Sequence, residues 1–209
     1  MSRLRAVEEA WAGKREDDAL NYLPPVFNRT QAKAVGLSDR SIYWLRDEGY
    51  IVTIARGLYR RSGQRPPELQ LAEIAARAPE ATLCLTTALT LHDLCDVHFP
   101  VTDVALPRGR HRPRGMRGVA WHAFNGATFH IGRDERRIGG GGLTIGLYNP
   151  ERCIVDALRL RHREEPHLGM EALKLWTGRE GSSVPKLLEL ARRIPQGAQA
   201  VRQALDALR

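Results

Sequence analysis

The sequence is poor in the features that mark secreted, membrane-spanning and disulfide-stapled proteins. Its 209 residues include only three cysteines, Cys84, Cys95 and Cys153, in apolar surroundings. An odd number in such surroundings predicts the reduced core thiols of a cytosolic protein rather than a disulfide framework. No apolar run approaches the roughly 18 residues that a membrane helix needs, and the charged residues 1–18 have no apolar core of a signal peptide. We therefore expect a cytoplasmic protein without membrane contact.

Lysine is scarce as well. Only Lys14, Lys33, Lys174 and Lys186 occur, so arginine carries nearly all of the positive charge. The formal net charge of +8 favours a polyanionic partner. With 43% hydrophobic and 27% charged residues, the composition is that of an ordinary globular protein. The length allows one large domain or two small ones.

Catalytic motifs are missing too. The sequence has no G-x-S-x-G, no P-loop and no H-E-x-x-H. The glycines at 139–142 do not follow the strand-to-phosphate pattern, so they predict only a flexible loop. Asp103, Glu151 and Asp156 are candidate nuclease carboxylates, but no lysine lies near them in the sequence. We expect no catalytic residue and no cofactor, and hence a protein that is not an enzyme.

One stretch, "HDLCDVH", has the residue types of a metal site. His92, Cys95 and His98 follow each other at three-residue steps, which resembles half of a zinc site. No second ligand pair with suitable spacing is present, and the leucine and valine between them are typical of a helix that packs an apolar side. We expect no metal.

The stretch after "NYLPPVF" carries the signals of two short helices separated by a turn. Thr30 stands at an N-cap position before "QAKAV", and Gly36 closes this first helix. Ser38 is the N-cap candidate of the next helix, which is predicted over residues 39–48. Gly49 then takes the C′ position, where glycine adopts a left-handed conformation without a Cβ clash.

Two β-rich segments, "YIVTI" and "GLYRR", follow and are joined by "ARG" as a tight hairpin, and "SGQRPP" is typical of a linker. An amphipathic helix is also expected over residues 3 to about 20. This order predicts a winged helix-turn-helix DNA-binding domain in residues 1–65. Residues 66–209 are predicted to form an α+β domain with a helical C-terminal tail, so the fold class is α+β.

The predicted helix over residues 39–48 has two unlike sides. Ile42 and Leu45 are expected to face the core, and long polar or aromatic groups lie opposite, as a helix in the major groove requires. From residue 29 to residue 65, eight Lys or Arg stand against three acids. A winged helix used only for protein contacts is the alternative. The DNA-contacting residues predicted on the helix and hairpin are Arg40, Ser41, Tyr43, Trp44, Arg56, Arg60 and Arg61.

The second region alternates strand-like and helix-like segments. Strands are predicted at "VTDVALPRG", "GVAWHAF", "ATFHIG" and "LTIGLY". Helices are predicted at "PELQLAEIAARAP", "TTALTLHDLCD", "PERCIVDALRLRHRE", "MEALKLWTG", "VPKLLELARRI" and "GAQAVRQALDALR".

A second basic run, "PRGRHRPRGMRG" at 107–118, holds five arginines, one histidine and no acid. It fits either a solvated hairpin tip or an arm that meets a polyanion or a protein partner. The arginines assigned to such a contact are Arg108, Arg110, Arg112 and Arg114.

Four stretches in order resemble one family from about residue 28 onwards. "GLSDRSIYWLRDEGYIVTIARGLYRRSG" is similar to the N-terminal winged helix of AbiEi-family antitoxins, which runs G-L-S, an arginine-bearing helix, a glycine, a strand and R-G-x-Y. "TTALTLHDL", "YNPERCIVDALRLR" and "LLELARRIP" resemble later segments of that family. Tyr43 and Trp44 stand where relatives usually have arginines or small polar residues.

The resemblance implies an antitoxin of a bacterial type IV toxin–antitoxin system. Its winged helix would bind inverted repeats in double-stranded promoter DNA and repress its own operon, as a monomer or a DNA-induced dimer. Its C-terminal domain would counter a nucleotidyltransferase-like toxin, functionally or by direct contact. Three alternatives stay open: an antitoxin that neutralises its toxin by direct protein contact, a solitary winged-helix regulator, and a nuclease fused to a winged helix.

Overall fold

The structure, a computed structural model, describes residues 18–66, 68–96, 100–139, 142–160 and 167–208. Its mixture of helices and sheets confirms the α+β class. The chain divides into two compact units: unit 1 is Met1–Pro79 with Arg137–Thr144, and unit 2 is Glu80–Arg136 with Ile145–Arg209. The predicted domain boundary after residue 65 stays a prediction. The helix expected over residues 3 to about 20 lies mostly outside the described residues.

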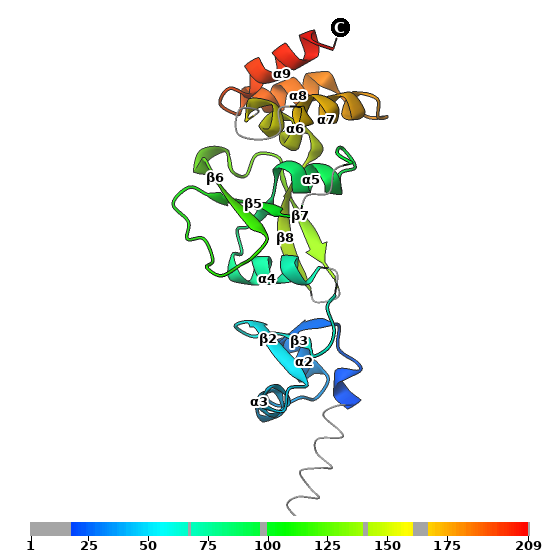
Figure 1. Ribbon diagram of the computed structural model, residues 1–209, viewed down its shortest axis with the longest axis vertical. Helices are drawn as coiled ribbons and strands as arrows, with labels where there is room; N and C mark the ends of the chain where they lie inside the picture. The colour runs from blue at the N-terminus through cyan, green and yellow to red at the C-terminus, as the bar shows by residue number, and fades with distance from the viewer. Residues whose placement is uncertain (1–17, 67, 97–99, 140–141, 161–166, 209) are drawn as a thin grey trace, which may run out of the picture. The chain divides into compact units, whose positions relative to one another are not determined.

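Unit 1 holds a helix-turn-helix followed by a hairpin, the arrangement predicted from the sequence (Figure 1). Its three-stranded antiparallel sheet has the order β1-β3-β2. The elements are β1 Val26–Asn28, α2 Arg29–Ala34, α3 Asp39–Asp47, β2 Ile51–Ala55, β3 Leu58–Arg61 and α4 Leu69–Arg77.

The start of α2 differs from the prediction. Asn28, not Thr30, is the N-cap, because its side chain accepts the Gln31 N–H at 2.9 Å. The Gln31 side chain in turn accepts the Asn28 N–H at 2.8 Å, which completes a capping box. The assignment of Thr30 as the cap was wrong, because Asn28 and Gln31 already form the reciprocal pair.

The ends of α3 are as predicted. The Ser38 side chain accepts the Ser41 N–H at 3.0 Å, and Gly49 follows the helix with a φ of +80°. Ile42 and Leu45 are buried in the core of unit 1. This core also contains Phe27 and Tyr59, whose ring centroids lie 5.9 Å apart. The short strand β1, which brings Phe27 to the sheet, was not predicted.

Unit 2 contains most of a mixed five-stranded sheet of order β6-β5-β4-β8-β7. The central β4 is antiparallel to β5 and parallel to β8, and β5 is parallel to β6. The strands are β4 Thr82–Leu83, β5 Thr102–Pro107, β6 Val119–Phe124, β7 Arg133–Ile138 and β8 Leu143–Tyr148.

The strand expected at "ATFHIG" was wrong. Gly126–Thr128 is a short 3-10 helix, η1, because the Asn125 side chain accepts the Ala127 N–H at 2.9 Å and starts a tight turn. Phe129 is then buried against the Tyr148 ring. The next strand is therefore β7, whose charged sequence "RDERRI" gave no strand signal.

Helices complete unit 2, and Figure 1 shows the four C-terminal ones packed together. They share one core with α5, Phe124, Phe129 and Tyr148. Each segment predicted to be helical contains a helix, although residues 161–166 lie outside the described residues. The helices are α5 Leu85–Leu91, α6 Pro150–Arg159, α7 Leu168–Thr177, α8 Val184–Arg192 and α9 Gly197–Asp206.

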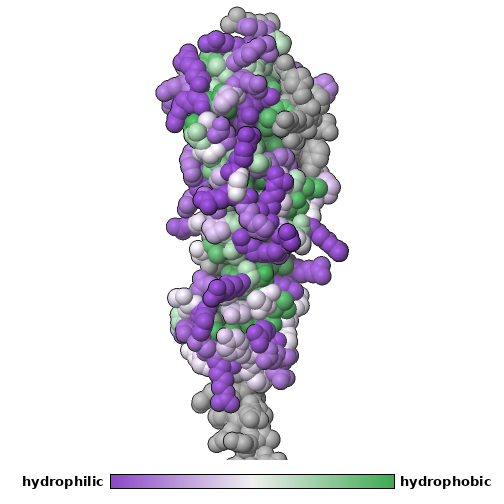
Figure 2. Space-filling view, turned by 90° about the vertical axis from the view of Figure 1, so that its left-hand side faces the viewer, coloured by the Kyte–Doolittle hydropathy of each residue, from purple (hydrophilic) through white to green (hydrophobic). Residues whose placement is uncertain are grey.

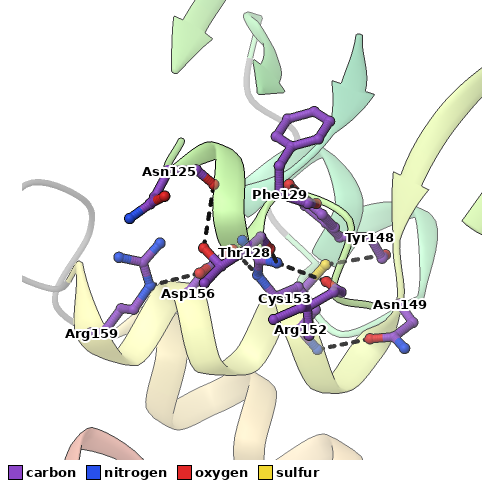
Figure 3. A network of polar contacts seen from close by, with 10 residues as sticks. Asn125, Thr128, Phe129, Tyr148, Asn149, Arg152, Cys153, Asp156 and Arg159 are labelled. Carbon is purple, nitrogen blue, oxygen red and sulfur yellow. Dashed lines mark hydrogen bonds and ion pairs between the residues drawn. The ribbon is translucent and has the colours of Figure 1, made fainter. Parts of the chain in front are cut away.

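A buried ionic network on α6 joins this helix to the η1 segment (Figure 3). Asp156 is fully buried and accepts the Nε–H groups of Arg152 at 2.8 Å and of Arg159 at 2.7 Å. Arg152 is fully buried too, and its Nη1 donates to the carbonyls of Thr128 and Ile131 at 2.8 and 2.7 Å. The network therefore ties the carbonyls of an irregular segment to a regular helix.

Aromatic contacts complete the surroundings of Arg152. Its guanidinium carbon lies 4.2 Å from the centroid of the Tyr148 ring, within reach of a cation–π contact. Its Nη2 has no hydrogen-bonding partner within the part of the chain that is described. The Tyr148 hydroxyl donates to the Phe129 carbonyl at 2.8 Å, and burial raises the pKa of that hydroxyl. Tyr148 is therefore neutral and holds η1 beside the arginine.

The cysteines are placed as expected. Cys84, Cys95 and Cys153 carry thiols rather than disulfides, and all are buried. Burial raises the pKa of the Cys153 thiol well above its usual value, so this thiol stays protonated and unreactive. Searched over the described residues, the helices include none that is long and apolar enough to cross a bilayer.

The first prediction concerns the stability of unit 2. Asp156→Asn leaves Arg152 with an uncompensated buried charge, a change that costs about 3–5 kcal/mol in buried pairs. We expect the free energy of unfolding, measured by urea denaturation and circular dichroism, to fall by that order. Arg159→Gln is the matched control, because the Arg159 side chain is 18% exposed and its charge can be solvated. Equal losses for both variants would contradict the assigned role of Arg152.

Candidate nucleic-acid interface

The exposed side of α3 carries the residues that the sequence assigned to DNA reading. Arg40 is exposed in the first turn, and Tyr43 follows one turn later with 49% of its surface accessible. The guanidinium of Arg46 lies 5.1 Å from the centroid of the Tyr43 ring and also pairs with Asp47 at 2.7 Å. Arg40 and Tyr43 are thus accessible on the surface of α3, and their contact with DNA stays a prediction.

Two other predicted contact residues on α3 are less accessible. Ser41 is 9% exposed, and its hydroxyl oxygen lies 2.8 Å from that of the capping Ser38. Trp44 is half-buried, packs against the core of unit 1 and stacks on Tyr50 with centroids 5.6 Å apart. The structure thus gives both side chains a part in holding α3, and their contact with DNA stays a prediction.

The tip of the hairpin is the turn Arg56–Gly57 between β2 and β3. Gly57 has a φ of +72°, which the turn requires and which glycine adopts without strain. Arg56 is exposed there. The Gly57 carbonyl accepts the backbone N–H of Arg29 at 3.1 Å, so the tip lies against the start of α2.

Arg60 and Arg61 lie at the other end of β3, and their guanidinium groups bond to backbone carbonyls. Arg60 Nη1 donates to the carbonyls of Arg61 and Gln64 at 3.1 and 3.0 Å. Arg61 Nη2 donates to the Leu23 carbonyl at 2.9 Å. The structure therefore brings Arg56 close to α2 but does not bring Arg60 and Arg61 to the tip, and their phosphate contacts stay a prediction.

A charged cluster that was not predicted from the sequence lies at the start of α2, where the hairpin tip contacts this helix. Asp39, in the first turn of α3, accepts from Arg29 Nε at 2.6 Å and pairs with Arg29 Nη2 at 2.5 Å. Lys33 Nζ lies 3.2 Å from the same carboxylate. The hydrogen bond from Arg29 lowers the pKa of Asp39 to about 2, so the carboxylate is ionised at any working pH. The i, i+4 spacing of Arg29 and Lys33 on α2 was the available signal.

This part of the chain matches a known family. Residues 23–62 match the family model described as "Transcriptional regulator, AbiEi antitoxin". The matched residues, called the AbiEi segment below, hold α2, α3 and the hairpin, so the resemblance to AbiEi antitoxins is confirmed there. That family is one of antitoxins and transcriptional regulators.

The chain is also similar to a solved structure. The crystal structure of the RV2827C protein from Mycobacterium tuberculosis is similar at a TM-score of 0.49 and 20% identity, over 92% of this chain and 81% of that chain. No curated protein matches the chain.

Outside the AbiEi segment, the basic run of unit 2 is an exposed loop between β5 and β6. Gly109, Gly115 and Gly118 have positive φ angles, so the loop is a series of turns. Arg110 pairs with Glu80 at 2.6 Å. Figure 2 shows hydrophilic side chains over most of the visible face. The arginines assigned to a polyanion or partner are all exposed: Arg108, Arg110, Arg112 and Arg114.

The candidate nuclease and metal residues do not form a site in the described ranges. Asp156 is neutralised by Arg152 and Arg159 in the core. Asp103 Oδ1, on β5, accepts a hydrogen bond from His122 Nε2, on the adjacent strand β6, at 2.9 Å. Within the described residues, no three His, Cys, Asp or Glu side chains are grouped as metal ligands are. His98 lies outside these residues.

The second prediction separates the two aromatic side chains of α3. Trp44→Ala removes packing against the core, so we expect a lower free energy of unfolding. Because Trp44 is only half-buried, the loss should be smaller than at fully buried tryptophans, where it is about 3–5 kcal/mol. Tyr43→Ala, at an exposed site, is expected to change stability by no more than about 0.5 kcal/mol. Urea denaturation of both variants is the measurement. A larger loss for Tyr43→Ala would show that Tyr43, not Trp44, anchors the helix.

Proposed function

We propose that the protein is a type IV antitoxin that binds its own promoter DNA and represses its operon. The AbiEi segment supports this, because its family is one of antitoxin transcriptional regulators. The observation that carries the proposal is the α3 helix, which buries Ile42 and Leu45 and exposes Arg40 and Tyr43. We further propose that it counters a nucleotidyltransferase-like toxin.

The roles of the contact residues follow from their positions. Arg40 is proposed to read a guanine edge, because arginine offers two parallel donors to its O6 and N7 atoms. Tyr43 is proposed to contact bases or sugar beside it. Arg56 at the hairpin tip is proposed to contact backbone phosphate, which positions the protein without reading sequence. An inverted repeat would be bound by two copies, each on one half-site.

The third prediction tests base reading by Arg40 in the full-length protein. Arg40→Ala should reduce discrimination between the promoter and random DNA of equal length by about 1–3 kcal/mol, the contribution of one bidentate base contact. Fluorescence anisotropy with both duplexes at one salt concentration measures it. Arg77→Ala is the matched control, because Arg77 lies on α4 in an ion pair with Glu73. Wild-type protein that binds both duplexes equally would reject the proposed function.

A second candidate, neutralisation by direct contact with the toxin, is favoured by one observation. The loop between β5 and β6 presents four exposed arginines in unit 2, apart from the AbiEi segment. Charged groups at an interface steer association and select the partner. An acidic face on the toxin would be the complementary surface.

The fourth prediction separates repression from neutralisation. A variant with Arg40 and Arg56 both changed to Ala should lose promoter repression and still rescue cells from the toxin. A variant with Arg108, Arg110, Arg112 and Arg114 changed to Ala should retain repression and lose rescue. Growth with induced toxin and a promoter reporter measure the two activities. If the first variant also fails to rescue while remaining folded, neutralisation works through DNA binding instead.

A further inference from the structure

Three elements of unit 1 meet at one point of its surface. The carbonyl of Gly57 at the hairpin tip accepts the N–H of Arg29, the first residue of α2, at 3.1 Å. The side chain of Arg29 then reaches Asp39 in the first turn of α3. The hairpin tip and both helices of the helix-turn-helix are thus linked through Arg29.

The charges at this point are mostly positive. Arg29 and Lys33 pair with the single carboxylate of Asp39, and Arg40 follows directly on α3. Arg56 is exposed in the hairpin turn, next to the Gly57 carbonyl that accepts the Arg29 N–H. The side chains of Arg29 and Lys33 are each 52% exposed. Asp39 occupies only the Nε and Nη2 donors of Arg29, and Lys33 has three donors of which one faces Asp39. Both cations can therefore hold Asp39 and a phosphate oxygen at the same time.

Stability does not account for this arrangement. Ion pairs between exposed side chains contribute little to folding, because solvent screens them and the side chains lose conformational freedom. An acidic group in the first turn of a helix that faces DNA would also repel phosphate unless cations neutralise it. Two cations on a neighbouring helix do so here.

We propose that Arg29, Lys33 and Arg56 form a phosphate-contact cluster, and that Asp39 is the positioning residue that fixes Arg29 and Lys33 beside the reading end of α3. This inference deepens the proposed DNA binding and rests on it. Phosphate contacts set the register of a protein on the duplex. Cations held by Asp39 donate to phosphate oxygens at one place only, so Arg40 meets the same base each time.

The first arm of the test uses random duplex DNA and the full-length protein. Affinity for DNA falls as salt rises, and each lost phosphate contact makes the slope of log affinity against log salt shallower by about 0.9. We expect this shallower slope for Arg29→Ala, for Lys33→Ala and for Arg56→Ala. The slope of the control Arg77→Ala should equal that of the wild type. Slopes of Arg29→Ala and Lys33→Ala that equal the wild-type slope would overturn the cluster.

The second arm tests the positioning role. Asp39→Asn removes a negative charge, so affinity for random duplex should rise, while the ratio of promoter to random affinity should fall because Arg29 and Lys33 are no longer fixed. A merely structural role would lower both affinities in proportion, and that result would overturn the role of Asp39. Thermal denaturation of each variant shows whether it is folded.

The two arms also separate this inference from the proposed function. Promoter preference of the wild-type protein tests the proposed function alone. The salt slopes on random duplex test the cluster alone, whether or not that preference exists.

Discussion

The burial of Ile42 and Leu45 decides how the N-terminal helix-turn-helix can be used. These two side chains pack with Phe27 and Tyr59, and this contact fixes the rotation of α3 about its own axis. Once that rotation is fixed, Arg40 and Tyr43 must face solvent, and Ser41 must face the cap at Ser38. The apolar pair therefore decides which side chains of α3 are exposed.

In unit 2, a buried arginine holds the irregular segment 125–132 in place. Residues 125–132 lack a strand partner for their carbonyls, and the carbonyls of Thr128 and Ile131 are met by Arg152. Asp156 balances the charge of Arg152, which would otherwise destabilise the core as an unpaired buried charge. Arg152 of α6 thus has a structural role. Asp156, a candidate nuclease carboxylate by sequence, is paired with Arg152 and Arg159 instead.

Much of the local structure could be predicted because its causes are local. Ser38 and Gly49 mark the ends of α3 by capping and by a left-handed φ, which depend on adjacent residues. Spacing also predicted the exposure of Arg40 and Tyr43 on α3, but not the burial of Ser41 or the packing of Trp44 against the core. The cap of α2 is an exception: both Thr30 and Asn28 are suitable residue types, and the reciprocal bond to Gln31 decides for Asn28.

What could not be predicted depends on contacts between distant residues. The sequence of β7 is highly charged, and this segment is a strand because it pairs with β8. The strand β4 has only two residues, too few to give a sequence pattern. The ion pair of Arg29 and Asp39 joins α2 to α3, and the angle between these helices cannot be derived from residue spacing. The candidate site was therefore predicted at Arg40 and missed at Arg29 and Lys33.

The central position of β4 has a consequence for the order in which the chain folds. Thr82 pairs with Gly146 across roughly sixty residues, so this ladder must wait for a long loop to close. The pairing of Asn28 with Leu58 spans about half that distance. During synthesis, the N-terminal residues leave the ribosome first. The helix-turn-helix can therefore be assembled, with its arginines exposed, on a nascent chain that has no central sheet yet.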